Sequence, residues 1–321
     1  MFNHILVPLD GSVLAECVIP HARIVAEALG ARITLLHVLE RSHSPDLNHT
    51  INPIDWHIRK VEAQTYLDRI TACLVDFVPD VCNVIVEGHA PEGVIDYAHH
   101  NNVDLITLSS HGRSGLSGWN VSSVVQKIIL RSYISTFIIR AYKTAGGCGG
   151  ELAYKKILIA LDCSQRAESA LPIAIRLARH QGARLLLAHV VSRPEMPRHL
   201  PRSREDTDLA ERLMGRNYSE AEHYLAQLDS QLSSAEISIQ TFLHIGSNAA
   251  ATLDDLVESE NVHLVVLSAH GYNGMEKWPY GSVAVNFIAY GATPLLIMQD
   301  IPFERSLRTR AESAARERPG H

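Results

Sequence analysis

The stretch Val103-Asp-Leu-Ile-Thr-Leu-Ser-Ser-His-Gly112 decides the fold, because it returns almost letter for letter as Val262-His-Leu-Val-Val-Leu-Ser-Ala-His-Gly271. Each copy is an apolar run that ends in small polar residues and glycine. This composition is expected where a parallel strand leads into a loop that binds a ligand. The chain therefore carries one kind of site twice, and its 321 residues suit two domains of ordinary size.

The repeat extends to both sides of this stretch. Residues 2–10 align with residues 154–162 at an offset of 162 − 10 = 152, and both runs indicate buried strands closed by an aspartate. Second strands of equal length follow over residues 31–38 and 183–190. Further strands are expected over residues 81–86, 136–141, 237–243 and 294–299, and helices over residues 56–77, 121–131, 208–232 and 283–290.

The first helix of each half has matching residues at its start and its end. Ser12 and Ser164 occupy N-cap positions. Pro20 and Pro172 lie inside the helical pattern at the same offset, so both helices should be kinked or should start late. The glycines that should end these helices are Gly30 and Gly182.

This order of elements predicts the fold class and the domains. Alternating strands and helices indicate an α/β protein with two tandem domains, each a five-stranded parallel sheet with helices on both faces. We expect the first domain over residues 1–142 and a glycine-rich linker over residues 143–153. The second domain should span residues 154–301, followed by a polar C-terminal tail over residues 302–321.

Composition excludes several classes of partner. The formal net charge of −6 does not favour a nucleic-acid binder, which needs a basic face. No apolar run approaches the ~18 residues of a membrane span, and the first ten residues indicate a strand rather than a secretion signal. The five cysteines are scattered, and neither a C-x-x-C pair nor an H-E-x-x-H metal motif occurs. We therefore expect a cytoplasmic protein without a metal site of its own.

The candidate ligand site lies at the carboxyl ends of the strands, where doubly wound sheets bind their ligands. Three features of each half should meet there: the aspartate closing strand one, the valine closing strand two and the Ser-x-His-Gly closing strand four. In the second half nine residues separate Gly271 from Gly281-Ser282, which open a helix. A glycine turn at a helix start presents backbone N–H groups and the positive end of the helix dipole, which suits phosphate.

The pattern Ser268-x-x-Gly271-(nine residues)-Gly281-Ser282 resembles the nucleotide loop of the universal stress protein family, usually written G-x-x-G-x9-G-S/T. The resemblance covers nearly the whole chain, twice, and implies a tandem protein with strand order 3-2-1-4-5 in each half. It further implies an ATP site in which Asp162 and Val190 flank the adenine. A Mg²⁺ ion that accompanies the triphosphate would be held mainly by phosphate oxygens. The residues implied to line the ribose and phosphates are Ser268, His270, Gly271, Gly281, Ser282 and Val283.

The first half departs from this pattern. Its matching set is Asp10, Val38, Ser109, His111, Gly112, Ser122, Ser123 and Val124. Serine replaces the first family glycine in both halves, and Ser122 replaces the glycine before the helix in the first half alone. A left-handed or closely approached backbone at that position would cost a serine about 1 kcal/mol. We therefore expect the second half to be the better nucleotide site.

Structural roles are an alternative for the same residues. The two strand-end aspartates could cap a helix or orient a loop, and the two histidines could be turn residues. Ser123 and Ser282 are good N-caps with or without phosphate.

Three functional hypotheses follow. An ATP-binding stress-response regulator fits the glycine loop and the lack of an obvious base–nucleophile pair. The alternatives are a weak ATPase or phosphotransferase, with His270 as proton acceptor, and a nucleotide-free protein whose sheets serve to dimerise. Neither a Walker P-loop nor a G-x-G-x-x-G dinucleotide motif occurs.

The resemblance also implies how the halves associate. The family commonly pairs through its last strand, so residues 137–140 and 295–298 are the expected contacts of an internal pseudo-dimer. Further association into a homodimer is expected.

Overall fold

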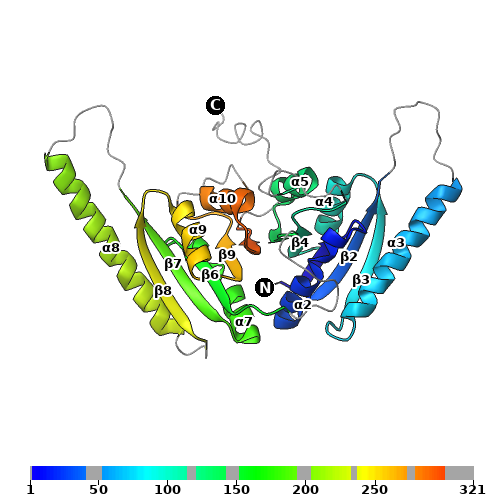
Figure 1. The fold of residues 1–321 in the computed structure, drawn as a ribbon, viewed down its shortest axis with the longest axis horizontal. Coiled ribbons are helices and arrows are strands. Elements are labelled where there is room, and N and C mark those ends of the chain that lie inside the picture. The colour runs from blue at the N-terminus through cyan, green and yellow to red at the C-terminus, as the bar shows by residue number, and fades with distance from the viewer. Residues whose placement is uncertain are drawn as a thin grey trace, which may run out of the picture. The chain divides into compact units, whose positions relative to one another are not determined.

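The computed structural model describes residues 2–40, 53–113, 121–141, 152–193, 204–232, 237–272 and 279–300. The chain forms two compact units (Figure 1). The first comprises residues 1–152 with the pieces 275–279 and 298–321, and the second comprises residues 153–274 and 280–297. Among the described helices, none combines the length and the apolar character that a membrane crossing requires.

The first unit is a parallel sheet in the order β3-β2-β1-β4-β5. Its strands are β1 (His4–Pro8), β2 (Arg32–Leu39), β3 (Val81–Glu87), β4 (Leu105–Ser109) and β5 (Ser135–Ile139). Its helices are α1 (Val13–Glu16), α2 (Ile19–Leu29), α3 (Pro53–Leu74), α4 (Ala90–His100) and α5 (Ser123–Ser132).

The second unit repeats this order as β8-β7-β6-β9-β10. Its strands are β6 (Lys156–Leu161), β7 (Arg184–Ser192), β8 (Ile239–Gly246), β9 (Leu264–Ser268) and β10 (Leu295–Met298). Its helices are α6 (Gln165–Glu168), α7 (Leu171–Gln181), α8 (Arg204–Leu232), α9 (Ala249–Ser259) and α10 (Ser282–Tyr290). The predicted fold class, two five-stranded α/β domains with strand order 3-2-1-4-5, is confirmed.

The helices cover both faces of each sheet because the direction in which successive strands are added to the sheet reverses once, after β3 or β8. Right-handed crossovers from β1 to β2 to β3 place α2 and α3 on one face, and the return to β4 and β5 places α4 and α5 on the other. Burial is greatest in the middle of the sheet: β4 and β5 are buried along their whole length, whereas the edge strand β3 is only partly buried. The carboxyl ends of β1 and β4 thus meet at the point where the strand order reverses, and those of β6 and β9 do so in the second unit.

The first helix of each half starts in two steps, as the prolines predict. A four-residue helix is followed by a separate longer helix, α2 or α7, that carries Pro20 or Pro172 in its first turn. Proline lacks an N–H donor and is tolerated there, whereas it would break a helix interior. Ser12 and Ser164 are the N-caps of the short helices. The longer helices end at Gly30 and Gly182, both in the left-handed conformation, with φ of 67° and 60°.

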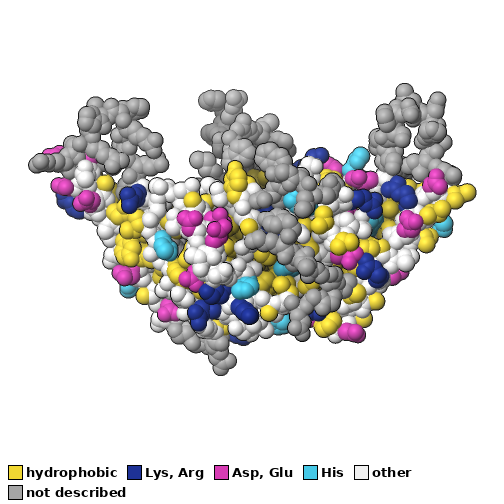
Figure 2. Space-filling view, in the orientation of Figure 1, with side chains coloured by type: hydrophobic (Ala, Val, Ile, Leu, Met, Phe, Trp, Pro, Cys, Tyr) yellow, Lys and Arg dark blue, Asp and Glu magenta, His cyan; other side chains and the backbone are white. Residues whose placement is uncertain are grey.

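Charged side chains of both signs are interspersed on the described surface that Figure 2 shows. This pattern gives no extended basic face of the kind that phosphate backbones require on the part of the surface in view.

Candidate functional site

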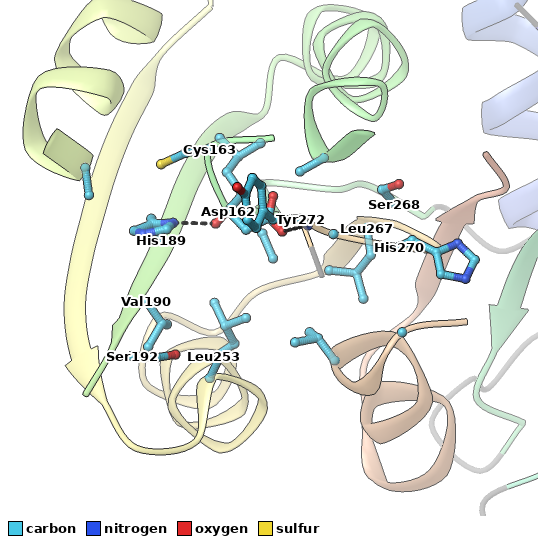
Figure 3. A pocket seen from close by; sticks show the side chains of 18 of the residues that line it. Asp162, Cys163, His189, Val190, Ser192, Leu253, Leu267, Ser268, His270 and Tyr272 are labelled. Atoms are coloured by element: carbon cyan, nitrogen blue, oxygen red, sulfur yellow. Dashed lines mark hydrogen bonds between the residues drawn. The ribbon is translucent and has the colours of Figure 1, made fainter. Parts of the chain in front are cut away.

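A cavity of about 780 Å³ lies at the carboxyl ends of β6, β7 and β9 in the second unit (Figure 3). Its walls are these strand ends, the first turns of α9 and α10, and one face of α8. The eight residues predicted for the second half all line it: Asp162, Val190, Ser268, His270, Gly271, Gly281, Ser282 and Val283. The structure thus brings together residues that are up to 283 − 162 = 121 positions apart in the sequence.

Asp162 ties the end of β6 to the loop after β9. Its Oδ1 accepts hydrogen bonds from the N–H (3.1 Å) and the hydroxyl (2.6 Å) of Ser164, and its Oδ2 accepts one from the N–H of Tyr272 (2.5 Å). Asp10 does the same in the first unit, accepting from the N–H groups of Ser12 (2.9 Å) and Arg113 (2.5 Å). The two aspartates therefore orient loops, which is the structural role considered as an alternative above.

The glycine of each Ser-x-His-Gly is required by this aspartate. A Cβ atom on Gly271 would overlap Oδ2 of Asp162, and a Cβ on Gly112 would overlap Oδ2 of Asp10. Neither glycine has a positive φ, so the requirement is space rather than backbone conformation.

Helix α10 begins on the wall of the cavity without a side-chain cap. Its N-cap is Gly281, with φ −76° and ψ 170°. The first N–H that bonds within the helix is that of Val285, which donates to the carbonyl of Gly281 at 3.0 Å. The N–H groups of residues 282–284 therefore have no acceptor within the helix, and these residues all line the cavity.

The corresponding helix of the first unit is capped by its own side chain. Its N-cap is Ser122, whose Oγ accepts from the N–H of Val125 at 3.4 Å. The predicted N-caps Ser123 and Ser282 are wrong by one residue, because both already have their place in the first turn of the helix. The capping residue must have extended backbone, and this falls on the preceding position in both halves.

The expected backbone strain at Ser122 is also wrong. Ser122 has φ −69° and ψ 160°, an extended conformation that any residue adopts. A Cβ on Gly281 would meet the carbonyl oxygen of Ala269 at 3.5 Å, which is an ordinary contact. The two halves therefore differ in how the helix N-terminus is satisfied, and not in backbone strain.

The serines that replace the first family glycine also differ between the units. The hydroxyl of Ser109 lies 2.8 Å from the carbonyl of Leu14 and 2.6 Å from that of His111, both within reach of its proton. The hydroxyl of Ser268 lies on the cavity and, among the described residues, has no hydrogen-bond partner. A buried hydroxyl of this kind is satisfied by a ligand or water.

The two histidines beside the cavity are oriented differently. His189, on β7, points to β6 and its Nδ1 lies 2.7 Å from the carbonyl oxygen of Leu161 (Figure 3). His270 is only 2% exposed, and its ring points away from Asp162 and Val190 (Figure 3). Its first-unit counterpart His111 is equally buried, at 2%, with Nδ1 3.1 Å from the hydroxyl of Ser110.

The remaining first-unit residues lie in the same local arrangement. Val38 is the residue before the last of β2, and a Cβ on Gly93 of α4 would lie 3.2 Å from its methyl groups, so helix and strand pack closely there. Ser123 opens α5, and Val124 is 38% exposed on its first turn.

One wall of the cavity was missed by the sequence analysis. It consists of four residues of α8 at positions i, i+3, i+4 and i+7: Asn217, Glu220, Ala221 and Tyr224. This spacing puts them on one helix face, which the sequence does contain. What the sequence does not indicate is that this face reaches past the end of the sheet.

Acidic side chains lie near the α8 wall and act on two weak acids beside it. Burial, with Asp162, Glu168 and Glu220 nearby, raises the pKa of the Cys163 thiol. Burial and the carboxylate of Glu168 raise the pKa of the Tyr224 phenol. Both groups therefore stay protonated near neutral pH. Within the described residues, no group of three His, Cys, Asp or Glu side chains could hold a metal ion.

Fold and site together define a tandem α/β protein with a cavity at the carboxyl ends of the strands of its second unit. A sequence profile of the universal stress protein family matches residues 1–140 and 153–299. The chain belongs to this family and is a tandem member of it.

Individual relatives match one half at a time. A universal stress protein of Methanocaldococcus jannaschii is 24% identical over 155 residues, covering 44% of this chain and 96% of the relative. Universal stress protein A homolog 1 of Coxiella burnetii is 28% identical over 116 residues, covering 36% of this chain and 81% of the relative.

Two solved structures match both halves. A universal stress protein from Archaeoglobus fulgidus superposes with a TM-score of 0.63 at 17% identity, covering 93% of this chain and 99% of that chain. A protein from Pseudomonas aeruginosa, described as functionally unknown, superposes with a TM-score of 0.64 at 14% identity, covering 99% and 98%. At these identities the likeness concerns the fold.

Proposed function

We propose that the second unit binds an adenine nucleotide, ATP, and that the chain acts as a nucleotide-binding regulator in the stress response. The observation that carries this proposal is the start of α10. Three backbone N–H groups, those of residues 282–284, line the cavity and have no acceptor in the helix. Uncapped N–H groups and the positive end of a helix dipole favour an anion such as a phosphate.

The other walls suit the rest of such a ligand. A volume of about 780 Å³ lies within the range of roughly 300–1,000 Å³ that small-molecule sites occupy. Val190 and Leu253 give an apolar surface for a base, and Ser268 offers an unpaired hydroxyl. A Mg²⁺ ion would be held mainly by the phosphates themselves, since the described residues include no three-ligand cluster.

The proposal assigns the nucleotide to the second unit rather than the first. In the first unit Ser122 supplies a hydroxyl to the helix N-terminus, and Ser109 is already hydrogen-bonded within the chain. Ser122 thus occupies one of the N–H groups that a phosphate would otherwise meet, and the Ser109 hydroxyl is already engaged where a ribose would lie.

A binding role is favoured over catalysis by the position of His270. Its ring points away from Asp162 and Val190, so it is poorly aimed at a ligand between them. The weak ATPase hypothesis is tested by measuring phosphate release from the wild type and from His270→Ala. Release by the wild type that is lost in the variant would restore this hypothesis.

The sharpest test exchanges the two capping residues. Gly281→Ser fits the backbone and gives α10 the cap that α5 has, so the hydroxyl competes with phosphate for one of these N–H groups, that of Ala284. We expect ATP affinity, measured by calorimetric titration, to fall about tenfold, which corresponds to roughly 1.4 kcal/mol. Ser122→Gly is the matched control and should leave this affinity unchanged. Absence of ATP binding by the wild type, or equal affinity of Gly281→Ser, would refute the proposal.

The second candidate function, for the first unit, is a role in dimerisation without bound nucleotide. It is favoured by Ser109 and Ser122, whose hydroxyl groups already have hydrogen-bond partners within the chain. Homodimer formation is proposed with it. Analytical ultracentrifugation of the full chain with and without ATP measures the dimer, and a monomer under both conditions would contradict the proposal.

A further inference from the structure

Each unit holds a second matched pair of residues that the nucleotide proposal does not use. The pair is a glutamate that ends the short helix, Glu16 in α1 or Glu168 in α6, and a tyrosine on the long helix, Tyr66 in α3 or Tyr224 in α8. The two tyrosines are 224 − 66 = 158 positions apart. The first residues of β3 and β8, which pair with β2 and β7, are also 239 − 81 = 158 positions apart. The two pairs are therefore structurally equivalent.

In the first unit this pair holds a guanidinium group. Nη2 of Arg69 donates to Oε1 of Glu16 at 2.6 Å, and Cζ of Arg69 lies 5.4 Å from the centroid of the Tyr66 ring. Glu16 is only 8% exposed, so its carboxylate is largely removed from water. A charge-assisted hydrogen bond and a cation–π contact together hold the arginine.

The second unit keeps the carboxylate and the ring but lacks the arginine. The helix sequences Glu62-Ala-Gln-Thr-Tyr-Leu67 and Glu220-Ala-Glu-His-Tyr-Leu225 align directly, and Gln227 then stands where Arg69 stands, at 227 − 69 = 158. Within the described part of the chain, Glu168 forms no ion pair. Arg216, also on α8, pairs with Glu220 at 2.9 Å.

The surroundings of Glu168 favour a cation. Asp162 and Glu220 lie close enough to act on the Cys163 thiol together with Glu168, and all three raise its pKa. In the first unit the residue at the position of Cys163 is Gly11, and Arg69 neutralises the matching carboxylate. In the second unit Glu220 is paired with Arg216, whereas Glu168 has no such counterion among the described residues.

We propose that the second unit carries a binding site for a guanidinium group between the carboxylate of Glu168 and the ring of Tyr224. The ligand class is a small guanidinium compound, and the first unit shows the geometry with its own Arg69. Tyr224 and Ala167 also line the cavity described above, so the two sites adjoin. The guanidinium site does not depend on whether the cavity binds a nucleotide.

The test is a titration of the full chain with L-argininamide, followed by NMR or calorimetry. L-Citrullinamide, which has a similar shape but an uncharged urea in place of the guanidinium group, is the control ligand. We expect one saturable site per chain and at least tenfold weaker binding of citrullinamide. Glu168→Gln should lose the site, whereas Glu222→Gln, an exposed carboxylate on the same helix, should keep it.

Two further variants exchange arginine and glutamine at the equivalent positions of the two units. Because they should change the stoichiometry in opposite directions, a variant that fails to fold cannot explain both results. Gln227→Arg should fill the site and reduce the stoichiometry to zero. Arg69→Gln should empty the first-unit site and raise the stoichiometry to two. Absence of saturable binding by the wild type, equal binding of citrullinamide, or an unchanged stoichiometry in both exchange variants would overturn the proposal. ATP affinity measured on the same samples tests the nucleotide proposal separately.

Discussion

Replacing Gly271 by alanine should destabilise the second unit through one atom. The added Cβ overlaps Oδ2 of Asp162, which must move and give up the hydrogen bond from the N–H of Tyr272. A hydrogen bond to a charged group contributes about 1.5–3 kcal/mol, so we expect the free energy of unfolding to fall by about 2–3 kcal/mol. Gly112→Ala should produce a similar loss in the first unit, where the overlap is with Asp10.

Equilibrium urea unfolding followed by circular dichroism measures these changes. Gly215→Ala is the opposite control, because Gly215 is exposed within α8 and a Cβ there meets no atom within 4 Å. It should stabilise the protein by about 0.5–1 kcal/mol.

A double-mutant cycle isolates the overlap from other effects. If the overlap is the cause, Gly271→Ala should cost little in an Asp162→Ala background, since no carboxylate is left to displace. Additive losses in the double variant would refute the steric explanation, even if both single variants are destabilised.

Two further predictions concern pH and capping. Burial lowers the pKa of His21 from 6.5 to about 3, so the unfolded chain takes up a proton that the folded chain excludes. The contribution of neutral His21 to the free energy of unfolding is therefore fully present above pH 6.5. It falls by about 1.4 kcal/mol per pH unit as the pH drops toward 3. His21→Phe should flatten this slope in urea unfolding at pH 5, 6 and 7 by about that amount, and an unchanged slope would contradict the assignment. Ser164→Ala should cost more than the ~1 kcal/mol expected for Ser12→Ala, because only Ser164 also donates to Asp162; equal thermal shifts would disprove the difference.

The fold could be predicted from the sequence because the repeat shows the strands twice. Buried parallel strands give continuous apolar runs, and the two copies at one offset leave little ambiguity about where each run ends. The late helix starts at Pro20 and Pro172 are predictable for the same reason. The start of α8 was placed near Asp208 and lies at Arg204, because polar residues in an exposed first turn leave no apolar period to detect.

The candidate site was predictable only in part. Strand-end residues follow from topology, and the cavity contains all those predicted for the second half. The position of an N-cap depends on one residue's backbone conformation, which adjacent glycine and serine do not reveal; this is why Ser123 and Ser282 were assigned instead of Ser122 and Gly281. The α8 wall depends on where this helix packs against the rest of the unit, and the local sequence does not reveal that packing.

The matched strand registers indicate where this protein tolerates added residues. The offset between the halves is 152 at β1 and β6, 158 at β3 and β8, and 264 − 105 = 159 at β4 and β9. All of the 159 − 152 = 7 extra residues of the second half thus entered between strands. One residue inserted within a strand would turn every following side chain to the opposite face of the sheet. Most of the length difference lies in the long helix, because α8 has 29 residues and α3 has 22. Added residues such as tags or protease sites are therefore best introduced between the strands rather than within them.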